Sequence, residues 1–354
     1  MDYGAESLQL HQRLKGKISV TGKAPVANEE QLSLAYAPGV AEPCRRIAGN
    51  RELVYDYTMK GNYVAVISDG SAVLGLGDIG PEAALPVMEG KCVLFKEFGG
   101  VDAIPLCLGT KDPDRIVEIV SALTPALGGV NLEDIAAPRC FDIERRLKRL
   151  CPIPIFHDDQ HGTAIIVLAA LINALKLLGK KKEELWVAMS GGGAAACAIA
   201  RLLLSYGFQN IAMCDIGGVI YEGRPDLNDD LQELAKLTNR WQIRGGLANI
   251  MMGSDVFIGV SVGGLVNQKM VGSMSPRPVA LALANPDPEI GPEAAKAAGA
   301  YIVGTGRSDY ANQVNNVLAF PGVFRGALDA RATDINEDMK LAAAQALANI
   351  VSDE

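Results

Sequence analysis

No C-x-x-C pair occurs in this chain of 354 residues, although it contains seven cysteines. Their odd number and wide spacing argue against the zinc and dithiol-redox motifs that such pairs build. Cysteines in this pattern are typical of small, buried, apolar residues in a reducing compartment.

Blocks of one charge sign are also missing. Lys and Arg number 33 and Asp and Glu number 41, which gives a net charge of −8. No run of basic residues stands out along the chain. Nucleic acid is therefore not an expected partner. The N-terminus lacks a basic start followed by an apolar core, and nowhere do about 18 apolar residues follow one another unbroken. We expect a cytoplasmic protein with no membrane segment.

The composition that is present is ordinary for a soluble globular protein. Hydrophobic residues make up 49% and charged residues 21%, which excludes disordered, collagen-like and coiled-coil chains. At about 150 residues per domain the length predicts two domains.

Between residues 53 and 179, short β-type runs alternate with helical patterns, which is typical of βαβ units around a small parallel sheet. Strands are predicted at 63–68, 103–107, 129–132 and 153–156. Helices are predicted from Pro81 onward and at 112–126, 142–150 and 163–178. The last helix is apolar on most faces, as expected of a helix buried between two layers.

A second alternating series predicts a Rossmann-type, doubly wound sheet, with strands at 185–189, 211–214, 256–260, 279–283 and 300–303. An alanine-rich helix is predicted over 336–351, and the pattern does not decide which domain it contacts. The predicted α/β architecture therefore has an N-terminal metal- and substrate-binding domain at 1–160. An NAD(P)-binding domain follows at 161–329, with a helical tail at 330–354.

A glycine-rich turn opens the second series. The turn and the start of the helix after it comprise Gly191, Gly192, Gly193, Ala194, Ala195 and Ala196. In the G-x-G-x-x-G/A pattern the first glycine makes a tight turn, the second admits the pyrophosphate, and the third position packs helix on strand. Asp215 stands about 20 residues further on, where an acid binds the ribose hydroxyls. Together these features predict a dinucleotide site.

The same acid favours NAD over NADP, because a carboxylate repels a 2′-phosphate. Residues 217–231 contain one arginine, Arg224, among four acids. NAD is thus the predicted cofactor, with NADP as the alternative. Asn285 ends another predicted strand, and it is either a loop asparagine or a contact for the ligand.

Two acid pairs follow predicted strands of the first domain: Glu133-Asp134 and Asp158-Asp159. Parallel strands end at one edge of a sheet, so both pairs can converge there. Either pair alone is more simply explained as a helix cap or a solvated loop. Together they predict oxygen ligation of Mg²⁺ or Mn²⁺. His157 and His161 suggest zinc instead, and we interpret them as structural or supporting residues rather than ligands.

Two further residues have alternative interpretations. Lys91 lies between apolar stretches and is either a surface residue with a buried stem or a desolvated amine whose lowered pKa suits a general base. Tyr36 precedes a proline turn and is by default a packing residue.

The motifs together closely resemble the short prokaryotic malic enzymes over nearly the whole chain. They are Tyr36-Ala37-Pro38-Gly39-Val40, Ser68-Asp69-Gly70, Leu74-Gly75-Leu76-Gly77-Asp78, Gly90-Lys91, Glu133-Asp134, Phe156-His157-Asp158-Asp159-Gln160-His161-Gly162-Thr163 and Asn315-Asn316-Val317. Larger members of the family have an arginine where this chain has Ala72.

The resemblance implies a role for each matching residue. Glu133, Asp134 and Asp159 are the implied metal ligands. Lys91 is the implied base, Asp158 assists it, and Tyr36 is the implied acid. Lys91, Asn285, Asn315 and Asn316 are the implied substrate contacts, and Asn285 is also a cofactor contact.

The activity implied is oxidative decarboxylation of malate to pyruvate through bound oxaloacetate, with reduction of NAD(P), in a homodimer. Two alternatives stay open. One is malolactic chemistry, in which the retained NAD returns its hydride and lactate is formed. The other is a nucleotide-binding protein that catalyses nothing.

Overall fold

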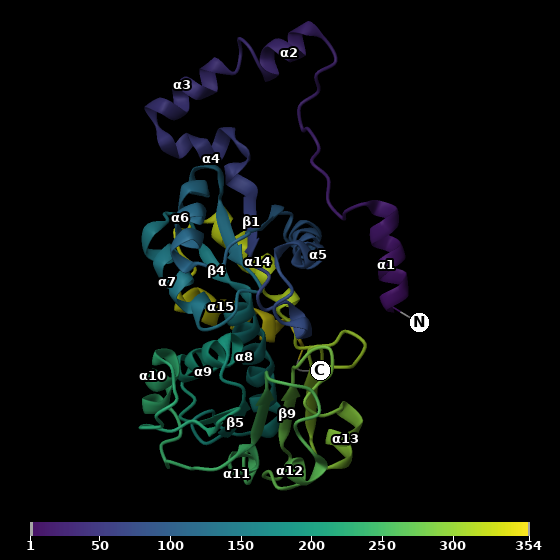
Figure 1. The fold of residues 1–354 in the computed structure, drawn as a ribbon, viewed down its shortest axis with the longest axis vertical. Helices are drawn as coiled ribbons and strands as arrows, with labels where there is room; N and C mark the ends of the chain where they lie inside the picture. Colours follow the sequence, from purple (N-terminus) through teal and green to yellow (C-terminus); the bar gives the residue numbers. More distant parts are fainter. Residues whose placement is uncertain (1–2, 353–354) are drawn as a thin grey trace.

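Two sheets lie one beyond the other along the long axis of the computed structural model, which describes residues 3–352 (Figure 1). Each sheet is built mainly from parallel strands with helices packed on its faces. The predicted two-sheet α/β architecture is confirmed.

The first sheet has four parallel strands in the order β2-β1-β3-β4. They are β1 (Tyr63–Ser68), β2 (Asp102–Cys107), β3 (Gly129–Leu132) and β4 (Ile155–His157). The main helices of this part are α5 (Pro81–Gly99), α6 (Pro113–Leu123) and α7 (Arg139–Leu150), with short 3-10 turns η3 (Leu74–Leu76) and η4 (Thr124–Ala126). Because the strands are parallel, β1, β3 and β4 all end at the same edge.

The second sheet has the order β10-β9-β8-β5-β6-β7, and β7 runs antiparallel to β6. Its strands are β5 (Trp186–Ser190), β6 (Asn210–Asp215), β7 (Gly218–Val219), β8 (Val256–Gly259), β9 (Val279–Ala282) and β10 (Ile302–Thr305). Its helices are α9 (Ala194–Tyr206), α10 (Asp229–Leu237), α11 (Leu247–Met251), α12 (Gln268–Gly272) and α13 (Pro292–Ala297). The strand order reverses at β5, which places the glycine-rich turn at the position where such sheets bind dinucleotides.

The long helix α8 (Asp158–Leu178) connects the two sheets. It begins at Asp158 rather than at Thr163, since the second acid pair forms its first turn, where free N–H groups favour carboxylates. By length and composition alone this helix is apolar enough to cross a membrane, but 56% of its apolar window is buried inside the protein. It packs against α9 and α15 as a core helix.

The C-terminal segment returns to the first sheet. After η5 (Asn316–Leu318), helix α14 (Phe320–Asp329) packs against α5, with the ring of Phe320 4.8 Å from that of Phe95. Helix α15 (Glu337–Ile350) then packs along α8. Residues 320–329 therefore contact the first sheet's helices, and the chain passes between the two units more than once.

An N-terminal arm, residues 3–49, lies for the most part away from the sheets (Figure 1). The arm is attached where the N–H of Lys17 donates to Glu89 on α5 at 2.8 Å and Lys23 pairs with Asp102 on β2. It contains α1 (Tyr3–Leu14), α2 (Glu29–Ala35) and α3 (Ala41–Gly49), and none of these helices has a buried residue. The short elements η1 (Arg51–Leu53), α4 (Val54–Tyr57) and η2 (Met59–Asn62) join the arm to β1. Several large apolar side chains of the arm are exposed: Leu8, Leu14, Val20, Val26, Leu34 and Tyr36.

Candidate active site

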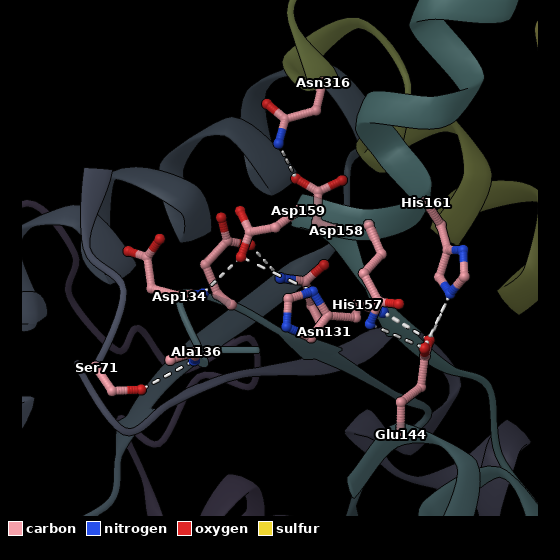
Figure 2. Close-up of polar contacts among 12 residues, drawn as sticks. Ser71, Asn131, Asp134, Ala136, Glu144, His157, Asp158, Asp159, His161 and Asn316 are labelled. Carbon is pink, nitrogen blue, oxygen red and sulfur yellow. Dashed lines mark hydrogen bonds and ion pairs between the residues drawn. The ribbon is translucent and has the colours of Figure 1, made fainter. Parts of the chain in front are cut away.

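Three carboxylates converge at the carboxyl edge of the first sheet. Glu133 and Asp134 follow β3, and Asp159 belongs to the first turn of α8. One oxygen from each lies within 4.8 Å of the other two. Figure 2 shows Asp159, at the start of α8, lying beside Asp134 at this edge. We call these three residues the carboxylate cluster.

Backbone and side-chain amide contacts fix the orientation of the carboxylates in the cluster. The backbone N–H of Asp134 donates to Oδ2 of Asp159 at 2.8 Å, and Nδ2 of Asn131 donates to Oε2 of Glu133 at 2.7 Å. Asp134 has a φ of +54°, a left-handed conformation that aspartate tolerates better than most residues. From the loop after β1, the N–H of Ala72 donates to the carbonyl of Asp134. The acids are therefore held in place by the loops themselves.

Lys91 lies beside this cluster. Its Nζ is 2.9 Å from Oε1 of Glu133 and 2.7 Å from Oδ2 of Asp158, and it sits 4.3 Å from the centre of the Phe320 ring. Helix α5 buries Met88, Lys91 and Phe95 on one side, as the helical repeat requires. Of the two interpretations left open for Lys91, burial of the amine is confirmed, but the lowered pKa expected with it is wrong.

The charges around Lys91 raise its pKa, although a buried amine usually has a lowered pKa. Burial alone would lower the pKa of Lys91, but the carboxylates of Asp158 and Glu133 outweigh burial and raise it above its usual value. The amine is therefore protonated when only the chain's own carboxylates surround it. An environment that suits a base requires part of this negative charge to be neutralised.

The pKa values of the acids are raised, whereas an acid in an exposed ion pair usually has a lowered pKa. Burial raises the pKa of Asp158 to about 7 and of Asp159 to about 6, against the lowering effect of Lys91. Burial likewise raises the pKa of Glu133. Desolvation by the surrounding protein is the main cause in each case. The cluster holds more negative charge than Lys91 alone compensates.

The second half of the chain contributes Asn316 to this site. Its Nδ2 donates to Oδ2 of Asp158 at 2.6 Å (Figure 2). Asn315 instead turns away, donating to the carbonyl of Gly306 and capping η5 through Val317. Of the two asparagines, Asn316 is the one that reaches Asp158.

Asn285 lies at the junction of the two halves. Its carbonyl would be 2.6 Å from a β-carbon placed on Gly75, so the loop after β1 approaches this strand end closely only because residue 75 is glycine. The side-chain amide of Asn285 lies near Gly306. Asn285 is thus close to both the first-domain loop and the segment that leads to Asn316.

Neither histidine belongs to the carboxylate cluster. His157 is fully buried, with Nδ1 3.8 Å from Oδ2 of Asp159. His161 points away from the cluster and contacts Glu144 at 2.9 Å through Nε2 (Figure 2). Both positions fit the interpretation of supporting residues.

The glycine-rich turn has the geometry of a dinucleotide loop. Gly191 has a φ of +133°, and a β-carbon there would lie 2.9 Å from the carbonyl of Val260. Gly193 caps α9, and no atom lies within 4 Å of a β-carbon built on it. Ala194 and Ala195 form the first turn of α9. The N-terminus of this helix is therefore open to an anion such as a pyrophosphate.

Asp215 ends β6 beside this turn, with its β-carbon 3.0 Å from a β-carbon placed on Gly192. Its Oδ2 accepts from Nη2 of Arg224 at 2.7 Å. Arg224 also pairs with Asp226, so these three charged residues together carry one net negative charge. The setting disfavours a 2′-phosphate even though Asp215 itself is paired.

Tyr36 is not brought to the carboxylate cluster within one chain. It follows α2 in the N-terminal arm and is 70% exposed, and Figure 1 shows α2 far from the first sheet. The arm has no buried residue in its helices that would hold it against the site.

Sequence patterns alone did not single out several residues that contact the acids and histidines of this region. Asn131 lies inside β3, Glu144 inside the amphipathic α7, and Lys340 inside the alanine-rich α15. A polar residue on an otherwise apolar helical face was the available signal for Glu144 and Lys340, as it was for Lys91.

Comparison with known proteins agrees with this geometry. The family model described as malic enzyme, N-terminal domain, matches residues 15–113 and 109–148, and that described as malic enzyme, NAD binding domain, matches residues 160–354. The chain belongs to the malic enzyme family.

Curated malic enzymes are similar to it over most of its length. A bifunctional malic/malolactic enzyme of Bacillus subtilis is 59% identical, covering 100% of this chain and 87% of that protein. An NAD-dependent malic enzyme of Geobacillus stearothermophilus is 54% identical, covering 96% and 71%. An NADP-dependent malic enzyme of Haemophilus influenzae is 52% identical over 96% of this chain but 45% of its own length.

Solved malic enzyme structures share the fold. That of the NAD-dependent malic enzyme of Thermotoga maritima has a TM-score of 0.95 and 49% identity, covering 98% of this chain and 93% of that one. A malic enzyme of Pyrococcus horikoshii has a TM-score of 0.94 and 47% identity, covering 99% and 84%.

Proposed function

We propose that this chain oxidatively decarboxylates (S)-malate to pyruvate and CO₂ while reducing NAD, with a divalent cation at the carboxylate cluster. The observation that carries this proposal is the position of Lys91, whose amine lies between Glu133 and Asp158 beside three converging carboxylates. A proton acceptor next to a cation site suits the oxidation of a 2-hydroxy acid.

Glu133, Asp134 and Asp159 would hold the cation. All their donor atoms are carboxylate oxygens, the ligands that Mg²⁺ and Mn²⁺ prefer. Close by, Oδ1 of Asn131, Oδ1 of Asp158 and both ring nitrogens of His157 are buried without a partner among the described residues. This polar setting fits a cation and a polar substrate. A divalent cation bound there would supply electrostatic stabilisation of negative charge on a substrate oxygen.

Lys91 would take the proton of the malate hydroxyl. Glu133 and Asp158 keep the amine protonated until part of their charge is neutralised, and its pKa then falls. Neutral Lys91 would accept the hydroxyl proton, and a nicotinamide bound beside the site would supply the hydride acceptor for C2. Asp158 holds both Lys91 and Asn316 and fixes the direction of the amine during this step.

Oxaloacetate formed in this way loses its C4 carboxylate as CO₂, and the electron pair left on C3 takes up a proton. Tyr36 is the donor that the family resemblance implies. The proton delivered by Tyr36 balances the one taken by Lys91. Malate and NAD⁺ thus give pyruvate, CO₂ and NADH with no net proton.

The cofactor would lie across the second sheet, with its pyrophosphate on the N-terminus of α9 and its adenosine ribose at Asp215. Asp215 keeps unused lone pairs for ribose hydroxyls beside its bonds to Arg224 and Gly217. The net negative charge of this corner supports NAD as the preferred cofactor over NADP.

A homodimer would complete the site. The N-terminal arm exposes large apolar side chains, among them Leu34 at 70% and Val20 at 97%. Such an extended apolar surface is stable in water only when something covers it. A second copy that received this arm would gain Tyr36 beside its own Lys91, and would supply its Tyr36 in return.

We place the protein in the cytoplasm, where its seven free cysteines stay reduced.

The test is an activity matrix with malate, in which NAD and NADP are each combined with Mg²⁺, Mn²⁺ or a chelator. We expect reduced cofactor and pyruvate to accumulate with NAD and Mn²⁺ or Mg²⁺, and chelator to abolish the reaction. The Bacillus subtilis relative is named as bifunctional, so malolactic chemistry is the second candidate. Lactate formed without net cofactor reduction would favour it, and no turnover in any combination would contradict both.

A further inference from the structure

Behind the carboxylate cluster, two buried charged side chains and the half-buried His161, from three helices, form one chain of contacts. Nζ of Lys340 on α15 lies 3.0 Å from Nδ1 of His161 on α8. Nε2 of His161 lies 2.9 Å from both carboxylate oxygens of Glu144 on α7. Lys340 is 3% exposed and Glu144 is 5% exposed. We call these residues the Lys340 relay.

The direction of each hydrogen bond in the relay follows from the groups involved. An ammonium has only N–H donors, so Nδ1 of His161 must accept from Lys340. The ring hydrogen of the neutral imidazole is then on Nε2, which donates to Glu144. Lys340 therefore selects the tautomer in which His161 binds Glu144.

Glu144 also holds the backbone next to the catalytic acids. Its Oε1 accepts from the N–H of His157 at 3.1 Å, and its Oε2 accepts from Nε2 of Gln160 at 3.2 Å. With His161, these contacts bracket Asp158 and Asp159 on both sides in the sequence. One carboxylate thus holds the turn from which both acids project (Figure 2).

Docking of α15 itself does not depend on Lys340. Ala344 and Ala348 are buried against the core, and Nδ2 of Asn173 on α8 donates to the carbonyl of Ala348 at 3.0 Å. At the start of the tail, Nζ of Lys148 donates to the carbonyl of Ile335 at 3.1 Å. Nζ of Lys340 also pairs with Oε1 of Glu337 at 2.7 Å, but both residues belong to α15, so this pair does not attach the helix. A buried ammonium at position 340 therefore needs an explanation other than helix attachment, since apolar packing serves that purpose at lower desolvation cost.

We propose that Lys340 is a positioning residue: through His161 and Glu144, the C-terminal helix fixes the direction in which Asp158 and Asp159 present their carboxylates to the cation and to Lys91. This inference rests on the proposed metal-dependent function. Residues that orient the ligands of a metal commonly change its affinity by about 10- to 100-fold when altered.

The experiment uses the full chain with three substitutions that alter the relay and one matched control. Lys340→Met removes the donor at nearly constant length, and Glu144→Gln removes the charge at constant size. Lys340→Arg restores a donor, for which a cavity of about 390 Å³ lined by Lys340, His161 and Arg201 gives room. Asn173→Ala is the control, because it removes the hydrogen bond from α8 to the carbonyl of Ala348 on α15 and lies outside the relay.

Two quantities are measured beside the melting temperature: Mn²⁺ affinity by titration, and amide hydrogen exchange of residues 157–162 in the metal-free protein. We expect Lys340→Met and Glu144→Gln to weaken Mn²⁺ binding about 10-fold or more and to speed exchange in this segment. Lys340→Arg should recover most of the affinity. Asn173→Ala should lower the melting temperature while Mn²⁺ affinity and exchange of residues 157–162 stay within about twofold of the unaltered protein.

The outcomes separate the inference from the function on which it rests. If the unaltered protein does not bind Mn²⁺, the metal proposal fails, while exchange of residues 157–162 still reports on the relay. Equal changes in Lys340→Met and Asn173→Ala, or unchanged exchange in both Lys340→Met and Glu144→Gln, would overturn the positioning role.

Discussion

A β-carbon placed on Gly162 would lie 1.9 Å from Oδ1 of Asp158 and 3.1 Å from the β-carbon of Asn316. Residues 158 and 162 are one turn apart on α8, so the side chain of Asp158 folds back over the helix into the space that any other residue at 162 would occupy. The glycine is needed for the position of this acid rather than for a turn.

Gly162→Ala is therefore expected to displace Asp158 from Lys91 and Asn316. We expect kcat to fall by about 100-fold or more and stability to decrease, because the contact is with a buried carboxylate. Steady-state kinetics and thermal melts measure the two effects. Gly326→Ala on α14 is the control: no atom lies within 4 Å of its β-carbon, so it should stabilise by about 0.5–1 kcal/mol. Normal activity in Gly162→Ala would contradict the packing argument.

Lys91→Met is expected to lower kcat by about 1,000-fold, which is the range for loss of a general base. It should also destabilise the metal-free protein by about 3 kcal/mol above pH 7, because Glu133 and Asp158 lose their buried partner. NAD affinity, measured by calorimetry, should not change. Retained turnover would reject Lys91 as the base, and equal stability of the variant would show that its carboxylates do not need the ammonium.

The sequence predicts much of this site, since strand ends collect side chains at one edge of a parallel sheet. Glu133 and Asp159 could be placed together for that reason, and Lys91 could be noticed because it interrupts an apolar helical stripe. The raised pKa of Lys91 could not be predicted, because its sign depends on the distances to Asp158 and Glu133. The choice of Asn316 over Asn315 depends likewise on tertiary geometry.

Long-range packing accounts for what the sequence left open. The sequence assigns residues 320–329 to the second unit, because they follow its last predicted strand. In the structure Phe320 and Phe324 pack on Phe95 of the first unit. Nothing local in a helix specifies which of two apolar surfaces it will cover. Glu144 was missed for a similar reason, as an acid on an amphipathic helix is usually solvated.

The pKa shifts of the acids predict opposite pH dependences for stability and metal binding. Asp158 and Asp159 titrate near 7 and 6 when folded and near 4 when unfolded. Their raised pKa values favour the metal-free fold below pH 4, and this contribution is lost as pH rises from about 4 to 7. Mn²⁺ requires the deprotonated acids, so its affinity should rise by up to tenfold per pH unit for each displaced proton over pH 5–7.

Melting curves at pH 5.5 and 8 with and without Mn²⁺ test this directly. The increase in melting temperature caused by Mn²⁺ should be larger at pH 8. Asp159→Asn should bind Mn²⁺ more weakly at both pH values, and its Mn²⁺ affinity should depend less on pH. An affinity that is independent of pH would mean that the acids are already ionised at pH 5.5.

Cofactor choice should depend on Asp215 more than on Asp226, although both pair with Arg224. Asp215→Ser removes the carboxylate at the ribose site and frees Arg224 for a phosphate. We expect the ratio of kcat/KM for NADP over NAD to rise about tenfold or more. Asp226→Ser frees the same arginine but leaves Asp215, so its ratio should change by less than about threefold. Equal changes of this ratio in the two variants would mean that the ribose of the cofactor does not bind at Asp215.

Mixing two inactive variants tests whether Tyr36 acts across a dimer. Tyr36 lies in the exposed N-terminal arm while Lys91 is buried beside the first sheet, so one chain alone does not bring the two together. Tyr36→Phe and Lys91→Met should each be inactive in decarboxylation when purified separately. After subunit exchange, a mixed dimer contains one site with the intact Lys91 of one copy and the intact Tyr36 of the other. Activity should therefore reappear, approaching a quarter of the unaltered value at equal concentrations, since half of the dimers are mixed and each has one working site. If both residues acted within the same chain, every site would carry one substitution and the mixture would stay inactive.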